Sequence, residues 1–302
     1  MWFWLSLIAL LCWSGSDLFS KIGCRDARDR YAHLKMVMAV GIVMGIHARY
    51  EIVAHGVEIS MSIIWTYLPV SLLYILSMTL GYVGLRYIEL SISSPVCNSS
   101  GMLVAVMSLA TGGLAAVNGW QLGAVALVCA GVIGLGIVES REDDDLRAAR
   151  QEASNYRYAK SWLALALPVA YCLLDAAGTF ADSLVLERLD EDSANVAYEL
   201  TFFAAAVLCF LYVVVYRRDK LVMKMEVPKY AGAIFETAGQ FAYIYAIGDA
   251  EHLMFSAPII SAYCAASVLW GRVFLKERLS WKHYAMIALV VAGIVILGLF
   301  DA

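Results

Sequence analysis

Four acidic side chains lie within apolar stretches of the sequence that are long enough to cross a membrane as helices. They are Asp17, Asp175, Glu199 and Glu236. A carboxylate in the hydrocarbon layer costs several kcal/mol unless it faces protein or water, so each is a candidate for binding a cation or a proton. Asp175 is the first choice, because Tyr171 precedes it by one helical turn and Gly178 follows on the same face.

The other three acids differ in their surroundings. Glu236 shares its helix face with small and polar residues that suit a cavity wall, namely Gly232, Gly239, Gln240 and Tyr243. Asp17 follows Trp13 by one turn and precedes Lys21 by another, so it is either a site residue or half of an ion pair. Glu199 comes early in its predicted helix.

Few basic side chains are available as partners for these acids. Lys21, Arg86 and Arg272 lie near the ends of predicted helices, which leaves the interior net acidic. A carboxylate buried without a basic partner tends to hold a proton until a cation displaces it. This competition is the minimal chemistry of a proton-coupled exchanger. Asp182 and Glu187 approach the predicted membrane boundary, where solvation explains them.

Aromatic and polar side chains also recur at three- and four-residue spacing along two predicted helices. One series is Tyr67, Ser71, Tyr74, Met78 and Tyr82, and the other is Tyr263, Ser267 and Trp270. Aromatic walls beside carboxylates suit organic cations, through cation–π attraction, and also aromatic or zwitterionic solutes. Packing between helices is an equally open interpretation of both series.

The predicted substrate-binding residues combine the four acids with aromatic and amide side chains. These are Trp13, Tyr74, Tyr82, Asn98, Tyr171, Gln240, Tyr243, Tyr263 and Trp270. The seven cysteines stand singly, without a C-x-x-C pair or a histidine at ligand spacing, so we predict no metal site and no cofactor. Zinc-protease, nucleophile-elbow and phosphate-loop motifs are absent, so we predict no enzyme and expect no nucleic-acid partner.

Composition places these residues in a membrane protein. Of the 302 residues 62% are apolar and 16% charged, against about 25% charged in soluble domains. Apolar runs of about 18 to 25 residues match a hydrocarbon core of about 30 Å. They predict ten helices over 2–21, 33–50, 62–86, 92–110, 120–138, 160–186, 194–216, 229–247, 252–271 and 281–300. The first lacks a cationic start and a cleavage site, so we expect a retained helix.

An internal repeat organises these helices. Ala288–Gly298 resembles Ala126–Gly136, and Ser256-Ala-Pro258 matches Ser93-Ser-Pro95 at nearly the same offset. We therefore predict a first five-helix repeat over 1–138, a charged cytoplasmic linker over 139–159 and a second five-helix repeat over 160–302. Because five spans is an odd number, the second repeat enters the membrane inverted, and the halves enclose a central cavity.

The repeat also relates the acids and prolines of the two halves. It aligns Ser14 with Asp175 and Asp17 with Gly178, so each half places one acid near the same position. Pro95 and Pro258 either start their helices with a kink or leave backbone carbonyls free near a central site. Asn98 and Ser261 stand beside them as hydrogen-bond donors in both interpretations.

The basic residues indicate orientation. Of the 22 Lys and Arg, 20 fall on one predicted side of the membrane, and only Arg49 and Arg188 fall on the other. Cationic loops stay in the cytoplasm, so we expect a multi-pass protein of the cell (inner) membrane with both termini outside.

The stretch Phe274–Gly298, with Lys-Glu-Arg-Leu before a glycine-rich last helix, resembles the end of an EamA-type repeat of the drug/metabolite transporter superfamily. Gly81–Tyr87 leading into Ser93-Ser-Pro95 is similar to the junction between the third and fourth helices of that family. The resemblance implies ten helices around a central cavity and transport of small metabolites without ATP. The first half departs from the pattern, because Glu277 of the turn motif has no counterpart there.

Together these features predict a secondary active transporter, a proton-coupled exporter or exchanger of a small amine-bearing metabolite such as an amino acid or an organic cation. The alternative is a carrier of a neutral or anionic metabolite, such as a sugar or nucleoside, in which the acids serve proton coupling or structure. From other classes, a membrane-embedded enzyme or a receptor has weaker support in the motifs. The expected partners are the solute, protons and the lipid bilayer, and a monomer is compatible with the sequence.

Overall fold

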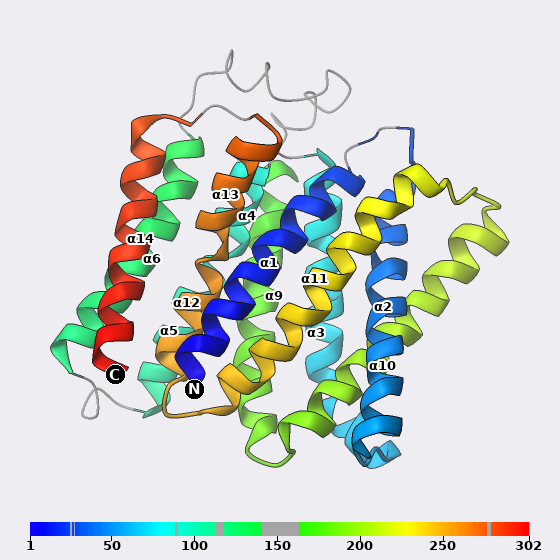
Figure 1. Cartoon of the computed structure of the whole chain (residues 1–302), viewed down its shortest axis with the longest axis horizontal. Coiled ribbons are helices and arrows are strands. Elements are labelled where there is room, and N and C mark those ends of the chain that lie inside the picture. The colour runs from blue at the N-terminus through cyan, green and yellow to red at the C-terminus, as the bar shows by residue number, and fades with distance from the viewer. Residues whose placement is uncertain are drawn as a thin grey trace.

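The computed structural model is a bundle of helices that stand side by side, with both chain termini at the same end (Figure 1). It describes residues 1–24, 26, 28–87, 90–112, 118–140, 163–276 and 279–301, and these contain no β-strand. Most of the predicted linker 139–159 and Glu277 of the turn motif lie outside the described residues.

In the part of the first half that the structure describes there are six α-helices. They are α1 (Trp2–Cys24), α2 (Ala32–Tyr50, continued by a π-helical turn Glu51–His55), α3 (Met61–Tyr87), α4 (Leu90–Cys97), α5 (Ser100–Gly112) and α6 (Gly119–Ser140). The second half contributes α9 (Leu163–Leu186), α10 (Glu191–Phe210, continued by a π-helix Leu211–Tyr216), α11 (Met223–Gly248), α12 (Leu253–Ser261), α13 (Tyr263–Phe274) and α14 (Trp281–Asp301).

Among the residues that the structure describes, eight helical segments are long and apolar enough to cross a membrane, so the chain is a multi-pass membrane protein. These segments are Trp2–Cys24, Ala32–His55, Met61–Leu85, Gly119–Val138, Ala166–Leu186, Glu191–Tyr216, Leu253–Phe274 and Trp281–Leu299. The predicted spans 92–110 and 229–247 are not among them, because the first is divided between α4 and α5 and the second belongs to the more polar α11.

Two helices break shortly after a proline. α4 ends two residues after Pro95, and α12 ends three residues after Pro258, before α5 and α13 resume in turn. A proline ring removes one backbone donor and crowds the preceding turn, which weakens a helix around it. Both prolines therefore lie beside a break in the helical path of their half.

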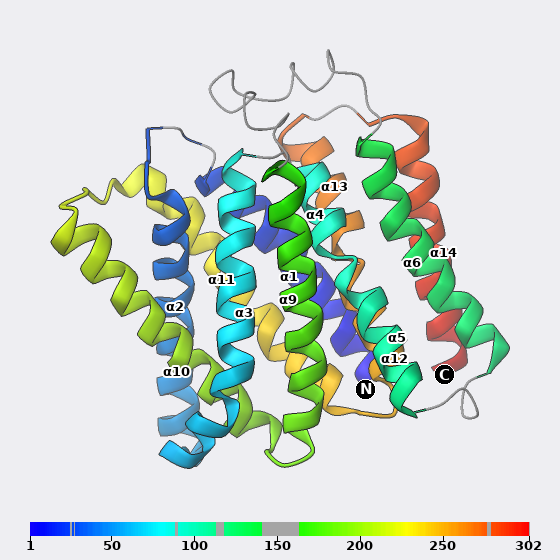
Figure 2. The same cartoon turned by 180° about the vertical axis from the view of Figure 1, so that it is seen from behind.

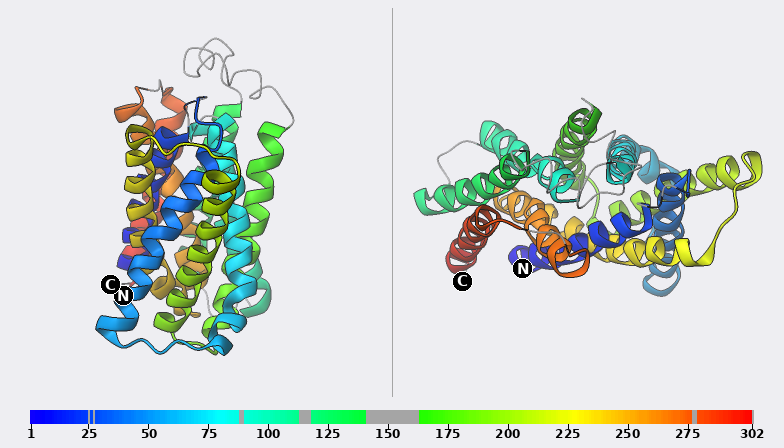
Figure 3. Two further views of the ribbon diagram at one scale, coloured as in Figure 1. Left: turned by 90° about the vertical axis from the view of Figure 1, so that its right-hand side faces the viewer. Right: turned by 90° about the horizontal axis from the view of Figure 1, so that it is seen from above.

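The halves interleave, because each main helix packing pair takes one helix from either half (Figures 1 and 2). The most extensive of these pairs are α1 with α11, α6 with α14, α2 with α10, α3 with α9, α2 with α11 and α5 with α12, and α4 also meets α13. Seen from above the bundle is elongated, with α6 and α14 at one end and α2 with α10 at the other (Figure 3). The central helices α1, α3, α9 and α11 therefore surround the region where a site can form.

Small side chains allow this close packing. A Cβ atom on Gly131 of α6 would lie 2.5 Å from the Val290 side chain, and one on Gly293 of α14 would lie 2.6 Å from the Ala124 carbonyl oxygen. On α1 the serines at positions 6, 14, 16 and 20 are all buried, whereas Trp4 is 69% exposed. Small and polar residues inside with large apolar ones outside is the arrangement that suits helices packing in lipid.

Candidate functional site

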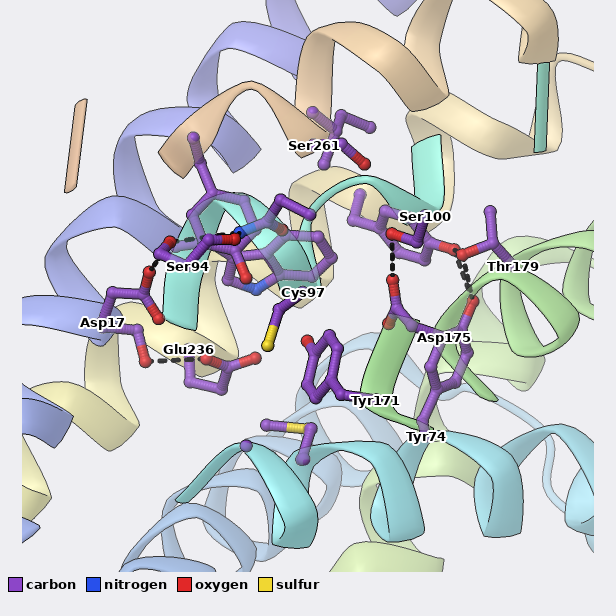
Figure 4. Close-up of a pocket in the computed structure, with 18 of the residues that line it drawn as sticks. Asp17, Tyr74, Ser94, Cys97, Ser100, Tyr171, Asp175, Thr179, Glu236 and Ser261 are labelled. Atoms are coloured by element: carbon purple, nitrogen blue, oxygen red, sulfur yellow. Dashed lines mark hydrogen bonds between the residues drawn. The ribbon is translucent and has the colours of Figure 1, made fainter. Parts of the chain in front are cut away.

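A pocket lies in the middle of the bundle, between α1, α3, α9 and α11, and the broken helices α4–α5 and α12–α13 complete its wall (Figure 4). Eleven of the thirteen predicted binding residues line it: Trp13, Asp17, Tyr74, Tyr82, Asn98, Tyr171, Asp175, Glu236, Gln240, Tyr243 and Tyr263. The helical spacing and the cost of burying acids in a membrane thus identified residues that the fold brings together.

Three carboxyl groups face this pocket, and each accepts hydrogen bonds from serine. Ser100 donates to Asp175 at 2.7 Å, and Ser16 donates to Glu236 at 2.7 Å. The Asp17 carboxyl accepts from Ser94 at 2.6 Å and from Ser267 at 2.9 Å. Among the lining residues that the structure describes, none is basic. These oxygens therefore have neutral donors as partners.

The alternative interpretation of Asp17, an ion pair with Lys21, is wrong. The Lys21 ammonium donates instead to the Leu85 carbonyl oxygen at 2.8 Å, across to α3, while Asp17 points to the two serines. One helical turn of separation allows an ion pair but does not require it, because each side chain finds a partner on another helix. Asp17 therefore faces the pocket without a charged partner.

Three further polar atoms in the pocket wall have no hydrogen-bond partner. They are the indole Nε1 of Trp13, the hydroxyl of Tyr82 and the amide Nε2 of Gln240. The Tyr82 and Gln240 side chains are only 5% and 3% exposed. Because an unpaired buried donor costs free energy, these atoms are suited to acceptors on a bound solute or to ordered water.

Aromatic rings form one wall of the pocket. Trp13 of α1 lies 5.0 Å from the ring of Tyr243 and 5.9 Å from that of Tyr263, measured between centroids. Tyr74 lies 6.2 Å from Tyr243 and perpendicular to it. The rings thus pack on one another and also face the pocket.

Asp182 was predicted to be solvated near the membrane boundary, and this prediction is wrong. Its side chain is fully buried, and its two oxygens accept from Tyr67 at 2.7 Å and from Tyr74 at 3.3 Å. The signal was present in the sequence, because Asp182 follows Asp175 by seven residues on one helix face. Tyr67 belongs to this buried contact and not to the pocket lining that the structure describes.

Two predicted binding residues lie outside the pocket. The Glu199 carboxylate is fully buried against α2, where it meets His47 Nδ1 at 2.8 Å and accepts from the Asn195 amide at 3.3 Å. The Trp270 indole donates to the Ser14 hydroxyl at 3.0 Å and so joins α13 to α1. The structure gives both residues contacts between helices instead of a place in the pocket wall.

A buried ion cluster that the sequence did not indicate closes the end of the bundle opposite the chain termini. Asp29, before α2, lies 2.9 Å from the ammonium groups of both Lys35 and Lys229. Glu226 lies 3.2 Å from Lys229, and Asp219 lies 3.1 Å from Lys35. Burial raises the pKa of Asp29, but the hydrogen bonds from Lys229 and Lys35 outweigh it and hold that pKa below its usual value. The cluster joins α2 to α11.

The described residues contain no group of three or more histidine, cysteine or acidic side chains arranged to hold a metal ion. The pocket wall offers carboxyl, hydroxyl, amide and aromatic groups. These groups bind amines, exchange protons and hydrogen-bond to polar solutes.

Comparison with known proteins agrees with this arrangement. A solved structure, described only as the crystal structure of a protein, superposes with a TM-score of 0.64 at 17% identity, covering 98% of this chain and 96% of that chain. No curated protein matches the sequence. Residues 162–299 match the model of the EamA-like transporter family. The second half of the chain is thus similar to the EamA-like transporter family, a family of membrane transporters of small molecules, and the whole chain shares its fold with the solved structure.

Proposed function

We propose that this transporter carries a small amine-bearing metabolite, cationic or zwitterionic, and exchanges it for protons. The single observation that carries the proposal is the presence of three pocket carboxyls, Asp17, Asp175 and Glu236, whose partners are serine hydroxyls. A hydrogen bond from a serine hydroxyl only partly offsets the free-energy cost of burying a carboxylate. Binding of a cation or a proton at each carboxyl is therefore favoured. An ammonium group and protons therefore compete for the same oxygens.

The solute reaches both sides by alternating access between two inverted five-helix halves. The packing pairs support this, because exchanging the halves turns the α1–α11 pair into the α9–α3 pair and the α5–α12 pair into the α13–α4 pair, and leaves the α2–α10 and α6–α14 pairs unchanged. Gly131 and Gly293, aligned by the repeat, also meet each other's helices. If α4–α5 and α12–α13 each count as one interrupted span and α11 is included, the chain has ten spans. Carriers of this kind bind solute where the halves meet.

The orientation follows from the basic residues. We place the chain in the cell membrane with both termini outside, so that the Asp29–Lys35–Lys229 cluster lies toward the cytoplasm. That both termini lie at one end of the bundle supports an even number of spans (Figure 1).

A second candidate is a neutral or anionic solute, such as a sugar or nucleoside. The unpartnered Trp13 indole, Tyr82 hydroxyl and Gln240 amide favour it, because they are suited to the oxygens of such a solute. The carboxyls would then bind protons or hold the structure. A zwitterion satisfies both sets of groups, since its ammonium pairs with carboxylates and its carboxylate accepts from the donors.

The test begins with a thermal-shift screen of purified protein against amines, amino acids, nucleosides and sugars. The best binder is then assayed for solute-driven proton flux in liposomes, with the parent, Asp175→Asn and Glu236→Gln, and Asp249→Asn as a control outside the pocket wall. We expect the two pocket variants to lose flux and the control to keep it. Flux equal to the parent in both pocket variants would refute the carboxylate mechanism, and stabilisation by sugars alone would favour the second candidate.

A further inference from the structure

We propose that Asp182 is a proton-binding site of the carrier, distinct from the pocket carboxyls and joined to the pocket by the hydroxyls of Tyr74 and Tyr243. This inference rests on the proposed transport function and adds to the pocket carboxyls a further proton site, which lies outside the pocket wall. Four features of the structure support it: burial, the absence of a cation, a continuous hydroxyl chain and position in the bundle.

Among the side chains that the structure describes, none with a positive charge pairs with the Asp182 carboxyl group. Its side chain is fully buried, and its partners are the Tyr67 hydroxyl on Oδ1 and the Tyr74 hydroxyl on Oδ2. The titratable groups around it are Tyr67 and Tyr74 of α3, Tyr243 of α11, Tyr198 of α10 and, on its own helix, Asp175. An isolated carboxylate inside a membrane protein is costly, so the protonated form is the cheaper one here.

A chain of hydroxyl groups leads from Asp182 to the pocket. Tyr74 pairs with Tyr243, and the Tyr243 hydroxyl donates to Thr179 at 3.1 Å. Tyr74, Tyr243 and Thr179 all line the pocket, and Figure 4 shows Tyr74 and Thr179 joined beside Asp175. Proton transfer through hydroxyls needs donors and acceptors in continuous contact, and this chain provides them over its whole length.

The hydroxyl chain is satisfied in either direction. With Asp182 ionised, Tyr67 and Tyr74 donate to its oxygens and Tyr243 donates to Tyr74. With Asp182 protonated on Oδ2, that proton is donated to the Tyr74 oxygen, Tyr74 donates to Tyr243 and Tyr243 donates to Thr179. In passing from the protonated to the ionised state Asp182 loses one proton, Tyr74, Tyr243 and Thr179 each give one hydroxyl proton and receive another, and pocket water gains one, so that Thr179 then donates to Tyr243. No hydrogen bond is left unmade in either state.

Asp182 also lies between the pocket and one end of the bundle. It follows Asp175 by two helical turns toward the end of α9 at Leu186, and Tyr67 lies near the start of α3. These two helix ends lie at the lower end in Figure 1, where the Ser193 hydroxyl also donates to the Glu58 carbonyl. A movement that opens this end would admit water to Asp182 and favour release of its proton. Burial and exposure of this one carboxyl would then link the proton to the direction in which the pocket opens.

Infrared spectroscopy of the purified full-length protein tests the inference without a solute. The difference spectrum between the parent and Asp182→Asn at neutral pH is expected to show the loss of one protonated-carboxyl band. Asp182→Glu is expected to restore such a band, and Asp249→Asn is expected to leave it in place. In heavy water the band shifts as the proton exchanges, and Tyr74→Phe is expected to slow that shift, because the link to the pocket is cut.

Two results would overturn the inference. One is a difference spectrum in which Asp182→Asn removes ionised-carboxylate bands and no protonated band. The other is a deuterium shift in Tyr74→Phe as fast as in the parent. Neither depends on the identity of the solute, so they are distinguishable from failure of the proposed function, which appears as loss of amine binding or flux by the parent.

Discussion

Replacing Asp29 by Asn provides a sharp test of how this bundle is held closed at the end opposite its termini. The Asp29 and Lys229 side chains are 1% and 0% exposed, and Lys35 is 3% exposed. Removing one partner of a buried ion pair costs about 3–5 kcal/mol, because the remaining charge is left without compensation. Here Glu226 and Asp219 keep partial contact with the two lysines, so we expect the lower value, about 3 kcal/mol.

Thermal unfolding in detergent measures this cost. At about 2 °C per kcal/mol for a chain of this size, Asp29→Asn should lower the melting temperature by about 6 °C. The matched control is Asp26→Asn, since Asp26 pairs with Arg28 at the surface, where Arg28 is 83% exposed. Exposed pairs contribute about 0–1 kcal/mol, so this control should melt within about 2 °C of the parent. Equal melting temperatures for Asp29→Asn and the parent would refute the reasoning.

The same residue gives a pH dependence whose sign is fixed. Because the folded-state pKa of Asp29 lies below its unfolded value of about 3.9, its ionised form stabilises the fold. This contribution is complete above the unfolded pKa and is lost as the pH falls through the folded pKa. The parent should therefore lose stability in acid more steeply than Asp29→Asn does, and parallel profiles below about pH 4 would contradict this.

Three further predictions concern helix packing and the pocket wall. Gly131→Ala should lower thermal stability, because its Cβ would meet both backbone and side chain of α14, whereas Gly123→Ala, with open space around its Cβ, should not. Tyr82→Phe removes a hydroxyl that has no protein partner, so it should leave the melting temperature unchanged while weakening solute binding in a titration. Trp270→Phe removes the hydrogen bond from the indole to the Ser14 hydroxyl. It should lower the free energy of unfolding by about 1 kcal/mol and leave solute affinity unchanged in a titration of the folded protein.

Sequence reasoning was effective for the pocket because membrane energetics and helical spacing both act locally. Asp175 and Glu236 stand out as acids in apolar runs, and the 3.6-residue period places Tyr171 and Gln240 on the same faces. A spacing along one helix identifies a shared face. The spacing does not say that two faces line the same pocket. The structure shows this, because the faces of α9 and α11 point toward a common space.

The failures arise where tertiary packing decides. Asp182 was assigned to a helix end from hydropathy alone, yet its side chain is fully buried, because Tyr67 and Tyr74 of α3 pack against it. Glu199 and Trp270 have the residue types of a binding site, but their helices turn these side chains to His47 and Ser14. The rotation of a helix about its own axis is set by its neighbours and is not encoded in the spacing of its own residues.

The mutual contact of α6 and α14 constrains the sequences of the two similar segments that they contain. Gly131 leaves room for the helix that carries Gly293, and Gly293 leaves room for the helix that carries Gly131. A larger residue in one segment would require a smaller residue in the other, so a substitution in either segment is constrained by the other. This shared constraint accounts for the nearly identical sequences of Ala126–Gly136 and Ala288–Gly298, whereas the helices around the pocket carry different side chains in the two halves.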